Sequence, residues 1–266
     1  EAIILKDKNY EAIKSSVYKY GGVETVIYCD MKNATSSSYY YNRNRSSYYY
    51  DGDQTPNHDV VIVGWDDNYP KEYFNTEPAG DGAFICKNSW GQDFGDEGFF
   101  YISYYDTNIG MNSVVYTKLG NSDNYDKIYQ SDLMGEVGTM GFDDRPEAYF
   151  ANVYTAGKNE TLKAVSFYAT GPKTTYDVYV VTDFTDVSDL QQRTKVASGE
   201  MQYEGYYTIN LNEAVPLPDD RKFAVVVHVN TQDSTMPIAI EYNNDEKTAN
   251  FDITDGEGYI SLYGTK

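Results

Sequence analysis

The stretch Asn57-His58-Asp59-Val60-Val61-Ile62-Val63-Gly64-Trp65, followed by Phe84-Ile85-Cys86-Lys87-Asn88-Ser89-Trp90-Gly91, decides the fold of the first part of this chain. Each half contains a run of Val, Ile or Phe with a polar residue at its edge, which is typical of a buried strand. We predict that the two runs pair as neighbouring strands. Because His58 stands at the entry to the first run and Asn88 at the exit of the second, this pairing brings both side chains to one end of a sheet.

A histidine whose ring is hydrogen-bonded to an asparagine side chain is oriented to act on a nucleophile. If the oxygen of Asn88 accepts a hydrogen bond from a ring N–H of His58, the tautomer is fixed and the other ring nitrogen faces a nucleophile. Trp90, two residues beyond Asn88, would cover that hydrogen bond and keep water away from it. The alternative is a structural histidine that happens to precede a hydrophobic strand.

Three motifs make this region, from about Lys14 to Tyr105, resemble the second half of a papain-like cysteine peptidase. They are Asn57-His58 ahead of Val-Val-Ile-Val-Gly, Lys87-Asn88-Ser89-Trp90-Gly91, and Gly95-Asp96-Glu97-Gly98-Phe99-Phe100-Tyr101-Ile102. The resemblance implies that His58 is the general base and acid, that Asn88 orients it and that Trp90 shields the pair, with Ser89 and Gly91 supporting the site. It also implies hydrolysis of protein or peptide substrates without a metal or organic cofactor.

The nucleophile of that family is missing. In that family the nucleophile lies in a Cys-Gly-Ser/Ala-Cys-Trp/Tyr type segment about 130–150 residues before the histidine. In this chain only 57 residues precede His58, and they contain no such segment. We expect the Cys and the oxyanion-hole Gln on a separate N-terminal light chain, held non-covalently, because Glu1 lies just before the helix that would open the second lobe. The alternatives are a shortened chain, or an incompetent fragment that acts as a glycan- or surface-binding module. The intact His58 and Asn88 argue against the fragment.

Two residues beside His58 are candidates for a substrate pocket. Asp59 stands where the resembled family usually has a small residue such as Ala, at a position that commonly lines the pocket for the substrate residue two before the cut. A carboxylate there would favour a basic side chain, whereas in the alternative Asp59 points to solvent or pairs with Arg43 or Arg45. Asn57 is a tentative member of the same pocket.

The two cysteines, Cys29 and Cys86, lie in strand-like runs and are expected to be buried free thiols; a disulfide between them is the alternative. Cys29 is a poor candidate for a nucleophile, because it lacks the helix N-terminus or positive charge that activates a thiol. The Tyr- and Ser-rich segment from Thr35 to Tyr50 is expected to be a surface loop, or to border the substrate cleft. The segment from Asp66 to Gly82 is expected to be a solvated loop, with calcium binding as the alternative.

Composition restricts the function further. The net charge is −20, which argues against nucleic-acid binding and suits a protein secreted from, or displayed on, a bacterial cell. No apolar run is long enough to span a membrane. The chain begins with Glu1 rather than Met, and we therefore expect a processed product.

The pattern along the chain predicts a mostly β protein. A helix is expected from Asn9 to Tyr20 and strands fill the rest of an α+β first domain, the papain-like barrel lobe of residues 1–119; residues 120–126 are a linker. In residues 127–266 short alternating segments predict a β-sandwich or jelly roll. These segments are Leu162–Tyr168, Tyr176–Val181, Tyr206–Leu211, Phe223–Val229, Ile238–Tyr242 and Tyr259–Leu262.

The second domain resembles the lectin-like domain that follows the peptidase in papain-like enzymes of clostridial and related gut bacteria. The resemblance rests on the segments Lys127–Gln130, Ala151–Ala156, Glu160–Tyr168 and Lys222–Val227. The term lectin-like describes only the fold, and sugar binding would require a binding site in addition. Tyr203, Tyr206 or Tyr207 could stack on sugars, or else pack on the sheet, and His228 is expected to be structural.

Overall fold

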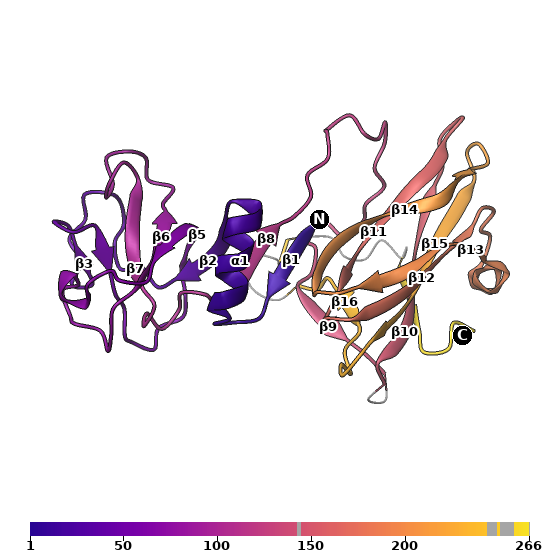
Figure 1. Ribbon diagram of the computed structural model, residues 1–266. Helices are drawn as coiled ribbons and strands as arrows, with labels where there is room; N and C mark the ends of the chain where they lie inside the picture. Colours follow the sequence, from indigo (N-terminus) through magenta and orange to yellow (C-terminus); the bar gives the residue numbers. More distant parts are fainter. Residues whose placement is uncertain (143–144, 244–248, 251–257, 266) are drawn as a thin grey trace. The chain divides into compact units, whose positions relative to one another are not determined.

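The computed structural model describes residues 1–142, 145–243, 249–250 and 258–265 and divides into two compact units (Figure 1). One unit comprises Ala2–Lys118, and the other comprises Leu119–Lys266 together with Glu1. Strands outnumber helices in both, and the first unit adds one α-helix, so the prediction of a mostly β chain with an α+β first part is confirmed. No helix among the described residues is both long and apolar enough to cross a membrane.

In the first unit, strands follow one another in the order β1-β8-β2-β5-β6-β7-β4-β3, with the single helix α1 beside them. Neighbouring strands are antiparallel except for the β4–β7 pair. The bounds are β1 (Ala2–Leu5), α1 (Tyr10–Tyr20), β2 (Val23–Ile27), β3 (Tyr41–Asn42), β4 (Ser47–Tyr48), β5 (His58–Asp66), η1 (Lys71–Tyr73), β6 (Ala83–Lys87), β7 (Phe99–Ser103) and β8 (Ser113–Tyr116).

The two motif strands pair as predicted. β5 lies between β2 and β6, with His58 opposite Ile27 and Val61 opposite Lys87. Their inward side chains form part of the core of the unit, where Ile62, Phe84 and Cys86 are fully buried. A shift of the strand register by one residue would expose these side chains to water, at a cost of about 25 cal/mol per Å² of apolar surface. As a result His58 is fixed at the first position of β5 and Asn88 just after the end of β6.

The helix is also confirmed, and its ends follow from the sequence. The side chain of Asn9 accepts a hydrogen bond from the N–H of Ala12 at 3.1 Å, which caps the first turn. Gly21 ends the helix in the left-handed conformation with φ 95°, which glycine adopts without strain. Ile13 and Val17 are buried, whereas Tyr20 lies partly exposed.

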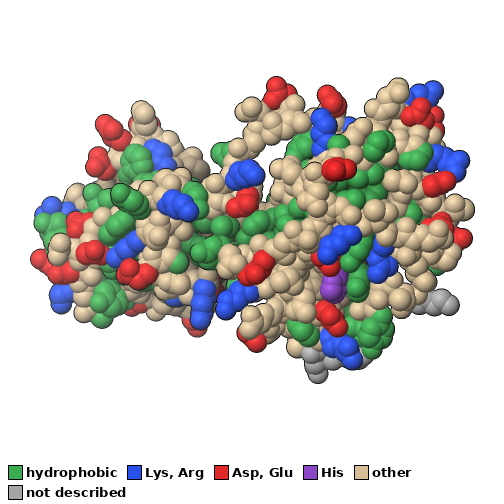
Figure 2. All heavy atoms as spheres, turned by 45° about the vertical axis from the view of Figure 1, so that its right-hand side comes forward, with side chains coloured by type: hydrophobic (Ala, Val, Ile, Leu, Met, Phe, Trp, Pro, Cys, Tyr) green, Lys and Arg blue, Asp and Glu red, His purple; other side chains and the backbone are tan. Residues whose placement is uncertain are grey.

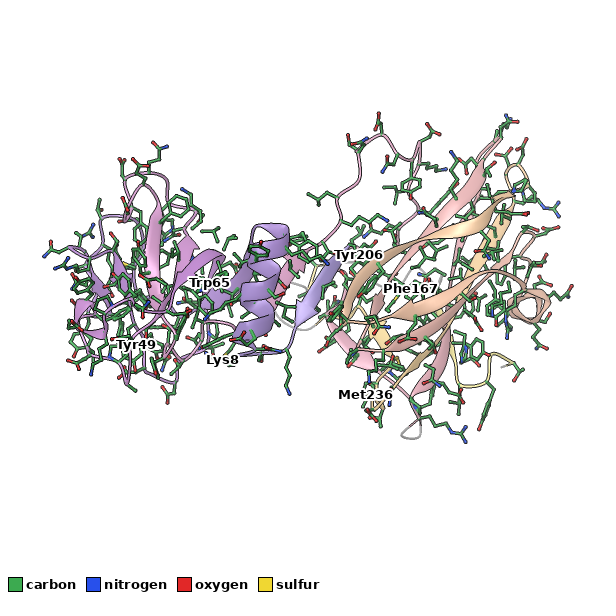
Figure 3. All side chains as sticks on the ribbon, in the orientation of Figure 1. Lys8, Tyr49, Trp65, Phe167, Tyr206 and Met236 are labelled. Atoms are coloured by element: carbon green, nitrogen blue, oxygen red, sulfur yellow. The ribbon has the colours of Figure 1, made fainter. Side chains whose placement is uncertain are left out.

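The expectation of a surface loop from Thr35 to Tyr50 is wrong for three of its tyrosines, whereas Tyr39 is exposed. Tyr41, Tyr48 and Tyr50 are buried in the core of the first unit, and Tyr41 and Tyr48 stand on the short strands β3 and β4. Tyr49, labelled in Figure 3, packs on Phe74 with ring centroids 6.3 Å apart. Because a tyrosine ring buries a large apolar area, these residues serve as core residues here. The hydroxyl of Tyr48 donates to the carbonyl of Tyr28 at 2.7 Å, and that of Tyr50 accepts the N–H of Gln54 at 2.9 Å.

Both cysteines are buried free thiols, as predicted, so the disulfide alternative is wrong. Burial raises the pKa of each thiol, well above its ordinary range in the case of Cys86. The nearby carboxylate of Asp30 adds to the effect on Cys29, whose Sγ–H points to the carbonyl of Met31 at 3.7 Å. An uncharged thiol is a weak nucleophile, so neither cysteine is suited to attack a peptide bond.

In the second unit, a five-stranded sheet has the order β13-β12-β15-β10-β17, and β11 pairs with β14 and β9 with β16. Phe167 on β11, labelled in Figure 3, packs on Phe150 and Tyr176 of the large sheet, so apolar side chains from two layers meet in one core. The bounds are β9 (Gly138–Met140), β10 (Glu147–Thr155), β11 (Thr161–Ala169), β12 (Thr174–Val181), η2 (Val187–Gln192), β13 (Thr194–Met201), β14 (Gly205–Pro216), β15 (Lys222–Thr231), β16 (Ile238–Ile240) and β17 (Gly258–Ser261). This is the predicted β-sandwich.

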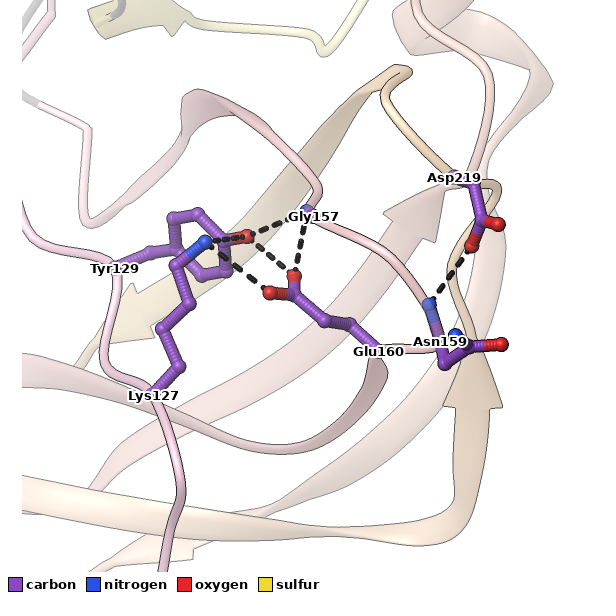
Figure 4. Close-up of polar contacts among 6 residues, drawn as sticks. All are labelled: Lys127, Tyr129, Gly157, Asn159, Glu160 and Asp219. Atoms are coloured by element: carbon purple, nitrogen blue, oxygen red, sulfur yellow. Dashed lines mark hydrogen bonds and ion pairs between the residues drawn. The ribbon is translucent and has the colours of Figure 1, made fainter.

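A compact polar cluster fixes the start of the second unit (Figure 4). The carboxylate of Glu160 accepts hydrogen bonds from the hydroxyl of Tyr129, from the N–H of Gly157 at 2.8 Å and from Lys127 at 3.1 Å. Hydrogen bonds to a charged acceptor are among the stronger ones. The cluster ties the segment around Lys127 to the turn between β10 and β11.

Charges of both signs are spread over the surface. On the face that Figure 2 shows, acidic and basic side chains alternate over both units, with no continuous basic patch in view. The whole chain carries 41 acidic residues against 21 basic ones.

His228 is structural in the way the sequence indicates. It lies on β15, stacks on Tyr149 with ring centroids 4.3 Å apart, and its Nε2 lies 3.8 Å from Glu147. Burial lowers the pKa of His228, although Asp177 and Glu147 oppose the effect. The folded chain therefore favours the neutral ring.

We expect acidification to destabilise the fold through His228. Its pKa is lower in the folded than in the unfolded state, whose value is about 6.5, so the unfolded chain binds the proton more readily. This contribution to stability is complete above pH 6.5 and is lost as the pH falls from there through the folded pKa. Melting temperatures between pH 7.5 and 5.5 should fall less in His228→Gln than in the wild type; equal falls would contradict the assignment.

Candidate active site

The side chains of His58 and Asn88 meet at the end of the β5–β6 pair. Nε2 of His58 lies 3.0 Å from Oδ1 of Asn88. The same Oδ1 accepts the N–H of Ser89 at 2.8 Å, which sets the orientation of the amide. An amide oxygen only accepts hydrogen bonds, so Nε2 carries the proton, and Nδ1 of His58 is left with a lone pair that can take a proton from a nucleophile.

Glycines of the third motif hold Asn88 in place. The N–H of Asn88 donates to the carbonyl of Gly98 at 3.0 Å. Gly98 has φ 90°, and a Cβ at this position would lie 2.9 Å from the carbonyl oxygen of Gly91 and 2.6 Å from Nζ of Lys87. Only glycine fits this conformation and this space. The spacing of the Asn-Ser-Trp-Gly and Gly-Asp-Glu-Gly motifs is therefore explained by one tight backbone contact.

Trp90 lies against the histidine. The rings of His58 and Trp90 have centroids 5.0 Å apart, and the indole also packs edge-on with Phe94, which is fully buried. Asn88 itself is only 4% exposed. A hydrogen bond from which water is excluded is electrostatically stronger than one in solvent, so the indole can strengthen the contact between His58 and Asn88.

Asn57, the residue before the histidine, forms a two-point clamp across the sheet. Its Oδ1 accepts the N–H of Cys29 at 2.7 Å, and its Nδ2 donates to the carbonyl of Cys29 at 3.1 Å. Its own N–H donates to the carbonyl of Ile27 at 3.0 Å. The backbone that carries His58 is thus fixed to the end of β2.

Asp59 lies apart from this clamp. Its side chain is exposed, and across the β2–β5 pair it stands opposite Val26. The described part of the chain contains no ion pair between Asp59 and Arg43 or Arg45: Arg43 donates to the carbonyls of Ala34 and Ser36, and the Arg45 guanidinium lies over the ring of Tyr73.

A cavity of about 420 Å³ opens beside the histidine. It is lined by His58 and Asn57 together with the segment that follows β2, namely Tyr28, Cys29, Asp30, Met31 and Lys32. The sequence motifs gave no hint of this segment, because its place beside the histidine depends on the clamp from Asn57 to Cys29. Asn57 therefore lines this cavity, and Asp59 is not part of its lining.

The carboxylates of the Asp66–Gly82 loop have local partners. Asp67 forms an ion pair with Lys14 at 2.6 Å and accepts the hydroxyl of Tyr104 at 2.8 Å, while Asp81 accepts the N–H of Lys71 at 3.0 Å. Across the described residues, no group of three or more His, Cys, Asp or Glu side chains converges as a metal site would require.

The tyrosines singled out for sugar stacking differ in exposure. Tyr207 is 8% exposed and belongs to the core of the second unit, so that assignment is wrong. Tyr203 is 55% exposed. Tyr206, labelled in Figure 3, is 37% exposed and packs against Tyr168 with ring centroids 4.9 Å apart.

Comparisons with known proteins agree with this geometry. A family model described as papain family cysteine protease matches residues 2–119, and one described as lectin like domain matches residues 128–266. A search of curated proteins found no significant match.

Two solved structures are similar over 99% of this chain. One is the clostridial cysteine protease Cwp84, in a cysteine-to-alanine variant after propeptide cleavage, with a TM-score of 0.85 and 27% identity. The other comprises the cysteine protease and lectin-like domains of Cwp84, a surface layer associated protein of Clostridium difficile, with a TM-score of 0.78 and 26% identity. The present chain spans 64% and 58% of those two chains, less than two thirds of either.

Proposed function

This chain belongs to the papain family of cysteine proteases through residues 2–119 and to the lectin-like domain family through residues 128–266, and from this we propose that it supplies the catalytic His and Asn of a bacterial cysteine endopeptidase. The observation that carries the proposal is the 3.0 Å contact between Nε2 of His58 and Oδ1 of Asn88, shielded by Trp90. It leaves Nδ1 of His58 to exchange a proton with a cysteine.

The reaction is acyl transfer to a cysteine that lies outside these 266 residues. The thiol gives its proton to Nδ1 of His58, and the thiolate attacks the peptide carbonyl. When the C–N bond breaks, His58 returns that proton to the leaving amine and a thioester remains. Water, with its proton taken by His58, then releases the acid and restores the thiol. Asn88 keeps the ring in place throughout.

We propose that the cysteine and the oxyanion-hole Gln belong to a separate light chain that binds this heavy chain without a disulfide. Support comes from Cys29 and Cys86, which are both buried free thiols in the folded chain. We further propose that the assembled enzyme works outside the cell or at its surface. The support is a net charge of −20 and the similarity to a surface-layer-associated protein.

Complementation tests this function. Residues 1–266 alone should not hydrolyse a fluorogenic peptide. Adding the N-terminal lobe of the same precursor, with its cysteine and glutamine, should produce hydrolysis that a thiol-directed reagent abolishes. Hydrolysis by residues 1–266 alone would contradict the proposal, and so would inactivity of the folded, assembled pair against a broad peptide library.

We propose that Asp59 favours a basic residue two positions before the cut. Its exposed carboxylate can attract Lys or Arg in the half-dry setting of an enzyme–substrate complex. Asp59→Ala should lower the ratio of kcat/KM for Arg over Leu at that substrate position by about three- to tenfold. Asp59→Glu, which keeps the charge, should preserve most of the preference. An unchanged ratio in Asp59→Ala would exclude this role.

A second candidate function is glycan binding by the second unit, and the observation that favours it is the exposed Tyr206 packed against Tyr168. Aromatic faces of this kind can stack on sugar rings. The full chain should then bind a glycan array, and Tyr206→Ala should weaken binding more than Tyr203→Ala. Absence of binding to every glycan would exclude this candidate.

A further inference from the structure

The backbone just after β2 is held by side chains from distant parts of the chain. Tyr28 and Cys29 directly follow β2 and lie outside any strand. The N–H of Tyr28 donates to Oδ1 of Asn108 at 3.0 Å, and its carbonyl accepts the hydroxyl of Tyr48 at 2.7 Å. The N–H and the carbonyl of Cys29 both bind the side chain of Asn57, at 2.7 and 3.1 Å. Side chains therefore satisfy all the backbone polar groups of this dipeptide, where a neighbouring strand would otherwise do so.

This dipeptide supports the backbone that carries His58. Asn57 binds Cys29 with both ends of its amide and directly precedes His58, the first residue of β5. Nε2 of the His58 ring is held by Asn88. The histidine is thus fixed at two points, its main chain through Asn57 and its ring through Asn88. A displacement of Cys29 would move Asn57, and with it the base of the His58 ring, relative to Asn88.

Asn108, the partner of Tyr28, is fixed by a buried carboxylate. Asp106 is 2% exposed. Its Oδ1 accepts the N–H of Asn108 at 2.9 Å and that of Ile109 at 3.0 Å, and its Oδ2 accepts the N–H of Tyr50 at 3.0 Å. An ionised carboxylate only accepts hydrogen bonds, and these three donors suit it. Because the ring of Tyr50 packs on that of Tyr28 at 4.6 Å, Asp106 supports Tyr28 both through Asn108 and through Tyr50.

A lysine binds the carbonyls of the same loop. Nζ of Lys8, labelled in Figure 3, donates to the carbonyl of Asp106 at 2.9 Å and to that of Ile109 at 2.6 Å. Burial raises the pKa of Asp106, while its three N–H donors and the charge of Lys8 act against this effect. These contacts offset the free energy that is needed to take a carboxylate out of water. The loop is therefore held from both its N–H and its carbonyl groups, and it presents Asn108 in one orientation.

We propose that Asp106 and Asn108 are positioning residues for His58. They fix the backbone at Tyr28, and the clamp from Asn57 to Cys29 transmits this constraint to the histidine. Both act through other residues, so they affect the orientation of the ring and leave its chemistry unchanged. The catalytic consequence rests on the proposed function, in which proton transfer requires Nδ1 of His58 to face the cysteine.

The chain contains two histidines, His58 and His228, and their ring nitrogens can be measured in residues 1–266 without a partner chain. Proton–nitrogen NMR of the nitrogen-labelled chain reports which nitrogen of each ring carries the proton. In the wild type, His58 should be protonated at Nε2 alone. In Asp106→Asn, which replaces one acceptor by a donor, and in Asn108→Ala, its signals should shift towards the average of the two tautomers. Those of His228, in the second unit, should stay unchanged.

A matched control lies in the same connection between β7 and β8. Asp7 accepts the N–H of Asn112 at 2.9 Å, so Asp7→Asn removes another contact between a carboxylate and a backbone N–H. This contact does not involve Asn108 or the backbone of Tyr28. The signals of His58 in Asp7→Asn should therefore equal those of the wild type.

In the assembled enzyme, Asp106→Asn and Asn108→Ala should each lower kcat by about 10- to 100-fold and change KM less than about twofold. Folded variants with wild-type His58 signals would overturn the inference, even if the N–H of Tyr28 then exchanges faster with solvent. Should Asp106→Asn fail to fold, Asn108→Ala decides alone. If the His58 signals change as expected but even the wild-type assembly hydrolyses no peptide, the positioning of the ring stands and the proposed function fails.

Discussion

The substitution His58→Ala is expected to lower kcat for peptide hydrolysis by the assembled protein by at least about 10³-fold, because base and acid are lost together. The ring contacts both Asn88 and Trp90, and in the proposed reaction its Nδ1 exchanges a proton with the cysteine. Without it the thiol stays protonated, and the leaving amine departs without a proton donor. Steady-state hydrolysis of a fluorogenic peptide measures the effect.

A matched control is available in the second histidine of the chain. His228 lies in the second unit, stacked on Tyr149, so His228→Ala should leave kcat within about twofold of the wild type. His58 is half-buried at the end of a strand, and circular dichroism should show an unchanged fold in His58→Ala. A folded, assembled His58→Ala variant that keeps a tenth of the activity would rule out His58 as the catalytic base.

The second large effect is expected from Asn88→Ala. It removes the acceptor 3.0 Å from Nε2 and leaves the ring free to change tautomer and to rotate. A hydrogen bond to a group that becomes charged contributes about 1.5–3 kcal/mol, so kcat should fall by about 10- to 100-fold. Substrate contacts are not touched, and KM should change little.

The variant Asn88→Gln distinguishes the effect of orienting the His58 ring from the effect of having any amide group in this position. The longer side chain keeps an oxygen acceptor but cannot keep both contacts of Asn88, one to His58 and one to the N–H of Ser89. Its kcat should lie between those of the wild type and Asn88→Ala. A rise in KM with unchanged kcat in Asn88→Ala would show that Asn88 contributes to substrate binding instead of positioning the ring.

The sequence alone was sufficient to predict the end of the sheet that carries His58 and Asn88, because local sequence signals and tertiary structure agree there. The apolar runs of β5 and β6 predict buried strands, and the glycines after Asn88 require one tight turn. The pairing of these strands by itself brings Nε2 of His58 to Oδ1 of Asn88. Helix α1 was equally clear, since Asn9 and Gly21 mark its two ends.

Other parts depend on contacts that no short stretch encodes. Tyr41, Tyr48 and Tyr50 sit among Ser, Asn and Arg, so the segment looks like a surface loop, yet the three rings fill the core beneath β7. The pocket formed by residues 28–32 exists because Asn57 binds Cys29 from a distance of 28 positions along the chain. Long-range contacts of this kind override local propensity.

In the second unit, too, local sequence patterns did not predict every strand. Strands β11, β12, β14, β15, β16 and β17 were anticipated from their apolar alternation, whereas β9, β10 and β13 were not. Strand β13 gives a weak signal because most of its side chains are exposed and it contains Lys195 and Gly199. As an edge strand with one partner, β12, it needs few buried residues. The misassigned Tyr207 has a related cause: alternation alone does not say which face of a strand is covered.

The most direct test of the central claim, a His/Asn half-site completed by a cysteine from another chain, is intact-mass analysis of the natively purified protein. Masses are compared before and after labelling with a thiol-directed peptide electrophile. We expect a second, smaller chain that co-elutes with this one and takes up one label, while Cys29 and Cys86 stay unlabelled in the folded protein. A single species of this chain's mass without label would contradict it, as would a label on Cys29 or Cys86.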